Sequence, residues 1–208
     1  LGLRRLGHRL RPQVVHAHDP HAVSTALLAT RLASEPRLLA GRRVDFHLRG
    51  VLSRWKYRSC QRVIAASRAI AQVLEADGLA TSRVRVVYEG VPLREPQPGG
   101  REALESLGVP AGAPVVGNVA ALTDHKDHRT LLEAMAIVRR SRPEARLVIV
   151  GDGELRSALE ARARALGLAE VVIFAGFRDD LDRLIPAFTV FCLSSHLEGL
   201  GTSLLDAM

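Results

Sequence analysis

Short runs of β-branched and other apolar residues alternate along the chain with longer segments whose apolar positions recur at helical spacing. The runs predict eight strands, at residues 13–18, 37–41, 62–67, 83–88, 114–120, 146–151, 171–176 and 190–195. The segments before and between them predict helices at residues 1–10, 21–33, 68–76, 127–140, 154–166 and 179–187, and a last one begins near residue 201. This alternation is typical of parallel sheets covered by helices, so the sequence predicts an α/β protein.

The segment VPLREPQPGG (91–100) interrupts the pattern with three prolines and two glycines. This composition predicts a linker, which we place at residues 93–100, between one α/β domain at 1–92 and another at 101–208. A complete doubly wound unit usually has about five or six strands, whereas each half here has four predicted strands. We therefore expect two Rossmann-like domains that are both incomplete in this chain.

The two halves differ in charge. Residues 1–90 contain sixteen Lys and Arg against six Asp and Glu, whereas residues 91–208 contain thirteen against sixteen. A basic first half favours an anionic partner such as an acidic membrane surface. Nucleic acid is a poor alternative, because no aromatic residues are interleaved with the arginines. The longest apolar runs are too short to span a membrane.

The cysteines and the first residues bear on the compartment. Cys60 and Cys192 lie in apolar contexts far apart in the sequence, which favours buried thiols in a reducing cytoplasm. Arginines interrupt any apolar run at the start, so no signal peptide is predicted. We expect a cytoplasmic protein, and peripheral attachment to the inner face of the cytoplasmic membrane is a further expectation.

Ligands of parallel α/β sheets bind at the carboxyl ends of the strands, and several strand ends of the second half carry suitable residues. Lys126, one of only two lysines, follows the 114–120 strand close to a helix N-terminus, where a cation can contact phosphate. Phe177 and Arg178 follow the 171–176 strand and are candidates for binding a nucleotide base. An ordinary turn in which Asp179 caps the next helix is the alternative.

The last segment, SSHLEGLGTSLLDAM, combines two carboxylates with two glycines. Gly199 and Gly201 leave backbone N–H groups uncovered where a helix begins, which predicts an anion site for a diphosphate. Glu198 precedes this turn. Asp206 follows it on the helix, where a carboxylate can accept hydrogen bonds from both hydroxyls of a ribose. A helix with an acidic first turn and no ligand is the alternative.

This ending resembles the carboxylate-x7-carboxylate motif of family 4 (GT4-like) retaining glycosyltransferases of GT-B fold. The similarity extends over most of the chain, because further segments follow in the order and spacing of that family: VVHAHD, VIAASRAIAQVL, VVYEGVPL, LVIVGDGELRSALE and VVIFAGFRDDL. The resemblance implies an acceptor domain followed by a donor domain that binds a nucleotide-diphosphate sugar. It also implies that the chain is an internal fragment of a longer protein.

The resemblance implies a role for each residue of the donor motif. Glu198 would hydrogen-bond sugar hydroxyls near the anomeric carbon, and Asp206, which stands where the family usually has Glu, would bind the ribose. The amides holding the diphosphate would be those of Gly199, Leu200, Gly201 and Thr202. Such a site needs neither a metal ion nor a cofactor.

Lys126 would neutralise the charge that develops on the leaving diphosphate. The family usually has an arginine a few residues earlier, where this chain has Ala120 or Ala121, and His125 is a candidate to take its place.

On the acceptor side, the family often places a histidine after the strand that corresponds to 37–41. His47, which follows a phenylalanine, is the preferred candidate for a catalytic role, and Arg43 is the alternative when residues are counted from the strand. His18 and Asp19 also lie at a strand end on this side, whereas a structural role is expected for His16.

The sequence therefore predicts a retaining glycosyltransferase that moves a sugar from a nucleotide-diphosphate sugar to a cell-envelope acceptor, a lipopolysaccharide, glycolipid or polysaccharide precursor. A nucleotide-sugar epimerase of GT-B fold is one alternative. A nucleotide-sugar-binding homologue whose catalysis has decayed is another. The chain by itself is expected to be inactive.

Overall fold

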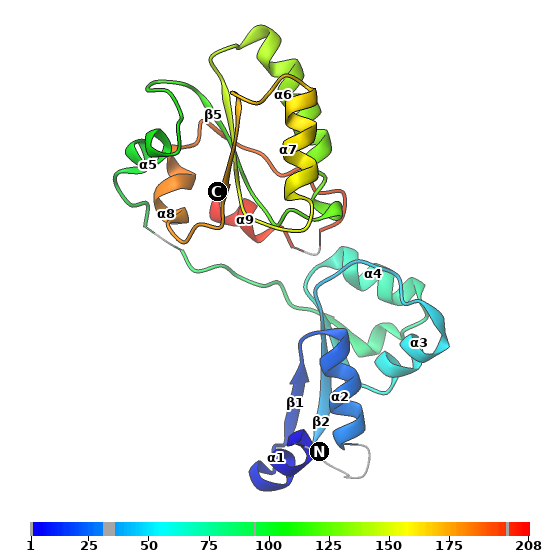
Figure 1. Cartoon of the computed structure of the whole chain (residues 1–208). Coiled ribbons are helices and arrows are strands. Elements are labelled where there is room, and N and C mark those ends of the chain that lie inside the picture. Colours follow the sequence, from blue (N-terminus) through cyan, green and yellow to red (C-terminus); the bar gives the residue numbers. More distant parts are fainter. Residues whose placement is uncertain (1, 31–35, 94, 199) are drawn as a thin grey trace. The chain divides into compact units, whose positions relative to one another are not determined.

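The computed structural model describes residues 2–30, 36–93, 95–198 and 200–208. The chain divides into two compact units, one made of Leu1–Gly90 and Glu198–Leu200, the other of Val91–Leu197 and Gly201–Met208 (Figure 1). Each unit contains one parallel four-stranded sheet, and the eight described strands coincide with the eight predicted ones to within a few residues. The prediction of an α/β protein is confirmed.

The first unit has the strand order β1-β2-β3-β4, which is the order of the sequence. Its strands are β1 Val14–Ala17, β2 Arg37–Arg42, β3 Arg62–Ala65 and β4 Val84–Val86. Its helices are α1 Gly2–Leu10, α2 Pro20–Thr30, α3 Gly50–Arg58 and α4 Arg68–Ala76, with a short 3-10 helix η1 at Thr81–Arg83. Residues 31–33, predicted as the end of the second helix, lie outside the described residues.

Side chains at the starts of α2 and α4 explain where these helices begin. The carboxylate of Asp19 accepts hydrogen bonds from the amides of His21 and Ala22, at 2.8 and 2.9 Å. The hydroxyl of Ser67 accepts one from the amide of Ile70 at 3.2 Å. All three are N-cap bonds, which satisfy amides that a helix cannot pair internally.

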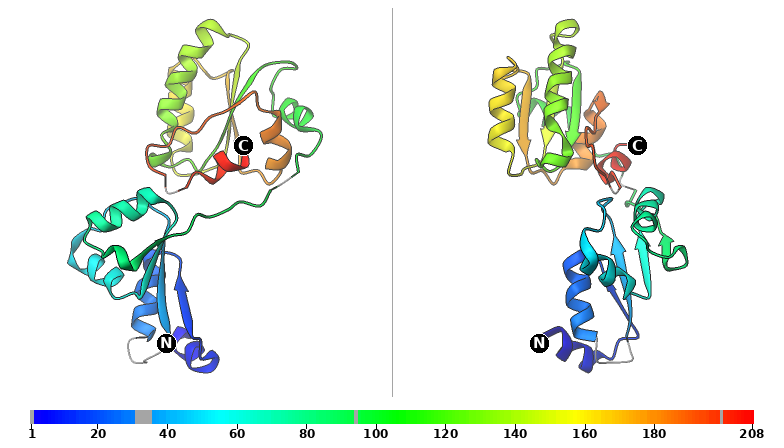
Figure 2. Two further views of the ribbon diagram at one scale, coloured as in Figure 1. Left: turned by 180° about the vertical axis from the view of Figure 1, so that it is seen from behind. Right: turned by 90° about the vertical axis from the view of Figure 1, so that its right-hand side faces the viewer.

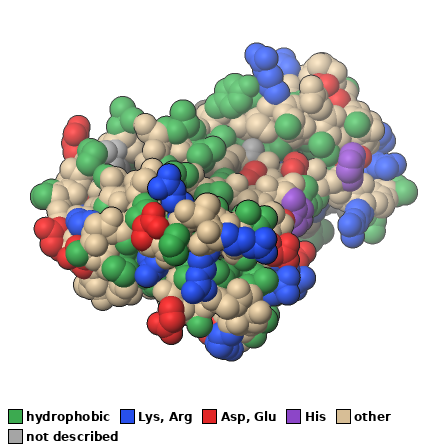
Figure 3. Space-filling model, turned by 90° about the horizontal axis from the view of Figure 1, so that it is seen from above, with side chains coloured by type: hydrophobic (Ala, Val, Ile, Leu, Met, Phe, Trp, Pro, Cys, Tyr) green, Lys and Arg blue, Asp and Glu red, His purple; other side chains and the backbone are tan. Residues whose placement is uncertain are grey.

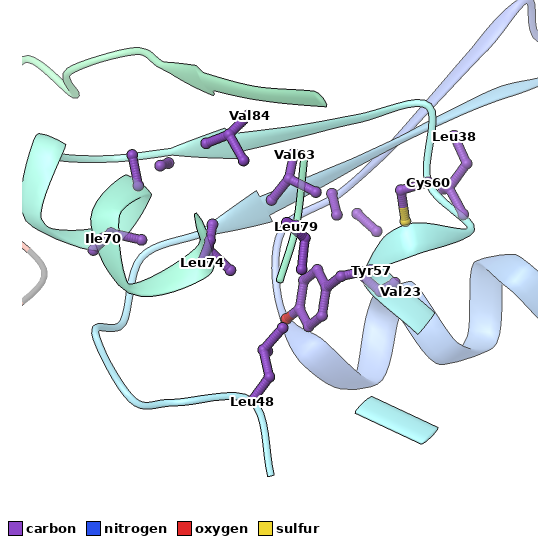
Figure 4. Packing of buried hydrophobic residues seen from close by; sticks show 14 of the residues in the cluster. Val23, Leu38, Leu48, Tyr57, Cys60, Val63, Ile70, Leu74, Leu79 and Val84 are labelled. Carbon is purple, nitrogen blue, oxygen red and sulfur yellow. The ribbon is translucent and has the colours of Figure 1, made fainter. Parts of the chain in front are cut away.

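One hydrophobic cluster holds the first unit together. Tyr57 of α3 is fully buried and lies among Leu48, Leu79 and Val23 (Figure 4). Its hydroxyl accepts a hydrogen bond from Nη1 of Arg42 at 3.3 Å, so the polar end of the ring is satisfied inside the core. The free thiol of Cys60 is also buried in this cluster, as expected, and burial raises its pKa to about 11.

The second unit has the strand order β7-β6-β5-β8. Its strands are β5 Val115–Val119, β6 Arg146–Val150, β7 Val172–Gly176 and β8 Val190–Phe191. Its α-helices are α5 Gly100–Ser106, α6 His128–Ser141, α7 Arg156–Ala165, α8 Leu181–Leu184 and α9 Thr202–Asp206. Two 3-10 helices complete it, η2 at Asp124–Lys126 and η3 at Ile185–Ala187.

Helices cover both faces of the second sheet, as Figures 1 and 2 show. Leu131 and Leu132 of α6 share one hydrophobic cluster with Leu159 of α7, whereas Leu104 of α5 shares another with Leu184 of α8. Strands covered on both faces must be apolar throughout, and β6 is buried from Leu147 to Val150. This is a doubly wound arrangement, in which the carboxyl ends of the strands are the place for a ligand.

No helix of the described residues is long and apolar enough to cross a membrane. On the face shown in Figure 3, basic and acidic side chains are interspersed with scattered hydrophobic ones.

Candidate functional site

The loop that follows β5 is held by the turn that follows β6. The amide of Leu122 donates to the carbonyl of Asp152, and the amide of Leu155 donates to the carbonyl of Leu122, both at 3.0 Å. A Cβ on Gly153 would stand 2.6 Å from the Leu122 carbonyl oxygen, so only glycine permits this approach. Gly153 of the VGDGE turn therefore permits close packing of the two loops, and this packing holds the chain that leads to Lys126.

Lys126 ends the 3-10 helix η2 and stands two residues before α6. The next residue, Asp127, has a positive φ of 47° and caps α6 by accepting a hydrogen bond from the amide of Thr130 at 3.3 Å. Hydrogen bonds from Thr130, first from its side chain and then from its amide, lower the pKa of the Asp127 carboxyl, and the nearby charge of His196 contributes. The sharp turn at Asp127 separates the lysine from the helix and places it at the carboxyl end of the sheet.

Two hydrogen bonds join this turn to the segment that follows β8. The hydroxyl of Ser194 donates to the carbonyl of Lys126 at 2.9 Å, and the amide of His196 donates to the carbonyl of His125 at 3.1 Å. The structure thus brings Lys126 and His125 together with the chain that leads into the predicted anion site. The strand β8 is shorter than predicted because residues 194 and 196 bond to this turn.

A buried polar network holds the segment after β8 at Cys192, two residues before Ser194. The side-chain amide of Asn118 donates to the carbonyl of Cys192 at 2.8 Å, and its oxygen lies 3.1 Å from Nε2 of His128. Asn118 and His128 are 1% and 2% exposed. Sequence reasoning missed both residues. The available signal was an asparagine in the middle of the apolar run VVGNVA, because a polar residue buried in a sheet needs partners.

The glycine turn and α9 follow. Glu198 and Leu200 are partly buried, and Gly199 lies outside the described residues. Gly201 directly precedes α9, where a Cβ would stand 3.0 Å from the Leu193 side chain. Thr202 and Asp206 begin and end the helix, both are exposed, and their spacing of four residues puts them on one side of it.

Phe177 and Arg178 follow β7. The Phe177 ring is 83% exposed. The guanidinium of Arg178 makes two hydrogen bonds to the carboxylate of Asp180, at 2.8 and 2.6 Å, which lower the pKa of Asp180 and raise that of Arg178. Asp180, not Asp179, stands at the N-cap position of α8, and its carboxylate is turned to Arg178 instead of capping the helix.

In the first unit, His47 is held by a carboxylate. Its Nδ1 lies 2.9 Å from Oδ1 of Asp77, whose other oxygen accepts a hydrogen bond from the amide of Leu48 at 2.6 Å. The His47 side chain is 69% exposed and that of Asp77 only 7%. Burial raises the pKa of Asp77, but the bonds from Leu48 and His47 outweigh it, so the pKa is lowered. The buried carboxylate of Asp77 therefore orients the imidazole of His47, and the rest of the ring is open to solvent.

His18 and Arg43 line one small cavity of about 30 Å³ together with His16 and Glu89, which is room for about one water. The rings of His16 and His18 lie 4.0 Å apart, and Arg43 forms an ion pair with Glu89. Burial, followed by the charges of His18 and Arg43, lowers the pKa of His16. Asp19 caps α2. In the described part of the chain, no three His, Cys, Asp or Glu side chains are grouped to hold a metal ion.

The two parallel-sheet units define the class, an α/β protein of the GT-B type. The family model described as "Glycosyl transferases group 1" matches residues 101–208, and the one described as "Glycosyltransferase Family 4" matches residues 1–95. The chain belongs to the group 1 glycosyltransferase family.

Two relatives and one solved structure show what this chain is similar to. The 2-deoxystreptamine N-acetyl-D-glucosaminyltransferase of Streptomyces fradiae is 31% identical over 95% of this chain and 53% of its own length. The lipopolysaccharide core biosynthesis glycosyltransferase LpsE of Rhizobium meliloti is 39% identical over 49% of this chain and 28% of its own. The crystal structure of Anabaena HepE with UDP-glucose has a TM-score of 0.83 and 25% identity over 99% of this chain and 59% of that one. The chain spans about half the length of the curated relatives that match nearly all of it.

Proposed function

We propose that this protein is a retaining glycosyltransferase that transfers a sugar from a nucleotide-diphosphate sugar to a cell-envelope acceptor, a glycolipid or polysaccharide precursor. Membership of the group 1 family supports the transferase activity. The UDP-glucose bound to HepE supports a nucleotide-sugar donor, and the name of LpsE supports an acceptor of the lipopolysaccharide type.

The observation that carries the proposal is the linkage between two strand ends. The bonds from Ser194 and His196 to the Lys126 turn keep the lysine beside the chain that leads to Glu198. A cation held near an anion site can stabilise charge on a leaving diphosphate without reorganising during the reaction. In this proposal Lys126 and His125 neutralise that charge, and His125 takes the place of the arginine that the family usually has.

The remaining donor contacts are assigned by chemistry. Glu198 accepts hydrogen bonds from sugar hydroxyls near the anomeric carbon. The backbone N–H groups of Leu200, Gly201 and Thr202 bind the diphosphate, because the first N–H groups of a helix have no partner inside it. Asp206 binds the ribose. The sugar keeps its configuration when the acceptor attacks from the face that the diphosphate leaves, and no metal ion takes part.

The base and the acceptor have separate candidates. Phe177, with its exposed ring, offers a stacking surface for the nucleotide base, and the Arg178–Asp180 pair beside it presents polar groups. In this proposal His47, whose ring is oriented by Asp77, exchanges a proton with an acceptor hydroxyl. His18 and Arg43 add basic groups suited to an anionic acceptor.

The two alternatives are less favoured. A nucleotide-sugar epimerase would leave the basic first half without a role, and the relatives are named as transferases. A homologue with decayed catalysis would need none of Glu198, Lys126 and a carboxylate-oriented histidine, and this chain has all three.

The test uses the protein expressed from its complete reading frame. UDP- and GDP-sugars are screened for thermal stabilisation and for transfer of radiolabelled sugar to membrane lipids. The variants are Glu198→Gln and Asp206→Asn, with Glu154→Gln, an exposed carboxylate of the second unit, as the matched control. One donor at a hundredfold excess over its Kd should stabilise the protein by about 2.7 kcal/mol, and both site variants should reduce this. A folded protein that no donor stabilises would contradict the proposal.

A further inference from the structure

The helix α3 (Gly50–Arg58) exposes apolar side chains that the first unit does not cover. Val51 and Leu52 are 81% and 82% exposed, and Trp55 is 46% exposed. Phe46, in the segment that leads to the helix, is 47% exposed. Scattered exposed apolar residues are ordinary, but four within ten residues, three of them on one short helix, indicate an interaction surface.

The helical arrangement separates this surface from the core-facing side. With roughly 100° per residue, Val51, Leu52 and Trp55 share one side of the helix with Arg54 and Arg58, and Tyr57 faces the opposite way. Tyr57 is fully buried, and Lys56 turns inward to donate to the carbonyl of Pro20 at 2.9 Å. The core therefore occupies the inner side of α3, and the apolar residues of the outer side take no part in it. Figure 1 shows α3 at an edge of the first unit.

The charge around these residues is strongly positive. Residues 42–58 contain six Arg and Lys and a single acid, Asp45. Arg42 is buried, Arg43 pairs with Glu89 and Lys56 turns inward, so the charge beside the apolar residues comes from the other three. Arg49 and Arg54 are exposed beside the apolar residues, as is Arg58, which donates to the carbonyl of Gly78. A tryptophan and aliphatic side chains flanked by arginines are typical of a segment that lies in the headgroup region of an anionic bilayer.

We propose that this α3 surface, made of Phe46, Arg49, Val51, Leu52, Arg54 and Trp55, docks the protein on an anionic lipid membrane. The apolar side chains enter the boundary between headgroups and acyl chains, and the arginines contact lipid phosphates. The long arginine side chains reach the phosphates while their stems cover apolar surface. The inference deepens the proposed function by naming the surface that would meet a lipid-borne acceptor, and it rests on that function only for this purpose.

The test is vesicle co-sedimentation of the protein from its complete reading frame, with phosphatidylcholine vesicles that contain or lack phosphatidylglycerol. No sugar donor is present here, and the donor screen by thermal stabilisation contains no vesicles, so failure of membrane binding and failure of donor binding are told apart. One variant, V51S/L52S/W55S, removes apolar contact. Another, R49Q/R54Q, removes charge. Matched controls are L28S/I137S, whose residues are also more than half exposed but lie elsewhere, and R140Q/R142Q on the second unit.

Binding should require the anionic lipid and weaken as salt is added. The apolar variant should lose about tenfold or more in partition coefficient, and the charge variant about fivefold for each arginine. Both control variants should bind like the wild type. The conservative variant Trp55→Phe should retain binding and should remove one component of the tryptophan quenching by brominated lipid, which reports whether Trp55 enters the bilayer.

Three results would overturn the proposal. The apolar variant, shown to be folded by circular dichroism, could bind as well as the wild type. The wild type could bind both kinds of vesicle equally, which would remove the role of the arginines. The wild type could also bind neither vesicle, which would assign the surface to a protein contact: with a second copy if the apolar variant abolishes self-association, and otherwise with another part of the complete protein.

Discussion

Acid should destabilise the second unit through His128, the first residue of α6. Its ring is 2% exposed, and Nε2 lies 3.1 Å from the side-chain oxygen of Asn118. Since the Asn118 amide nitrogen donates to Cys192, the network assigns the proton to Nε2 and leaves a lone pair on Nδ1. Nδ1 has no hydrogen-bond partner among the described residues, so a second proton would be buried there without an acceptor.

The size of the effect follows from the pKa. Burial, with a smaller contribution from the charge of Lys126, lowers the pKa of His128 from 6.5 to about 4, against an opposing contribution from Asp127. Between these two values the unfolded chain binds a proton that the folded chain does not. The stability contributed by His128 is therefore complete above pH 6.5 and is lost progressively as the pH falls toward 4. Near pH 4.5 the loss amounts to about 2–3 kcal/mol of unfolding free energy.

The assay compares urea unfolding of the wild type and His128→Gln at neutral pH and near pH 4.5. Glutamine can still donate to Asn118 but does not titrate. The difference between the two proteins in the pH-dependent loss of unfolding free energy therefore cancels the contributions of all other titrating groups. The wild type should lose about 2–3 kcal/mol more than the variant on acidification. An equal loss in both proteins would refute the reasoning, as would a ring pKa above about 6 measured by NMR in the folded protein.

Two further substitutions test the packing of each unit. Gly117→Ala should destabilise the second unit by about 1–3 kcal/mol in thermal or urea unfolding, because the new Cβ would overlap the Phe188 ring, and adding Phe188→Leu should restore part of the loss. Asp77→Ala should cost the first unit about 1–3 kcal/mol by leaving the buried Leu48 amide unpaired. His47→Ala, whose ring is exposed, should cost much less, and equal losses for these last two variants would show that the Leu48 bond is not what matters.

Most strands and helices could be predicted because their burial follows a simple period. The helix predicted at 68–76 is Arg68–Ala76 in the structure, where Ile70, Ala71 and Leu74 are buried on one side. The helix predicted at 179–187 is shorter, ending at Leu184 before a 3-10 turn that contains Pro186, which lacks the N–H that an α-helix needs.

Two helices were not predicted, for different physical reasons. The α3 segment has apolar residues on its solvent side and only Tyr57 buried, so it has no helical pattern of core positions. The α5 helix begins at Gly100, inside the segment that composition indicates as a linker. Gly100 is buried because the backbone at Arg183 lies where a side chain would be, so this glycine permits close packing rather than flexibility.

The candidate site was predictable only where its chemistry lies in side-chain identity. Glu198, Lys126 and Asp206 stand out in the sequence as functional groups at strand ends, and their roles stay predictions. Their support is made of main-chain hydrogen bonds from residues such as His196 and of the buried amide of Asn118, which no residue pattern encodes. Spacing along the chain carries no information on which carbonyl a distant amide meets.

The polar network also explains why a strand of the core contains an asparagine. Leucine at position 118 would suit the apolar surroundings, but it could not hold the Cys192 carbonyl where the chain leaves the sheet. From Cys192 onward the backbone turns to Ser194 and then to the bond with Lys126. A buried amide costs free energy unless all its partners are present, and here it directs the chain that carries the proposed donor contacts. This network leaves Nδ1 of His128 without a hydrogen-bond partner among the described residues. Protonation of that atom in acid should therefore disrupt the network.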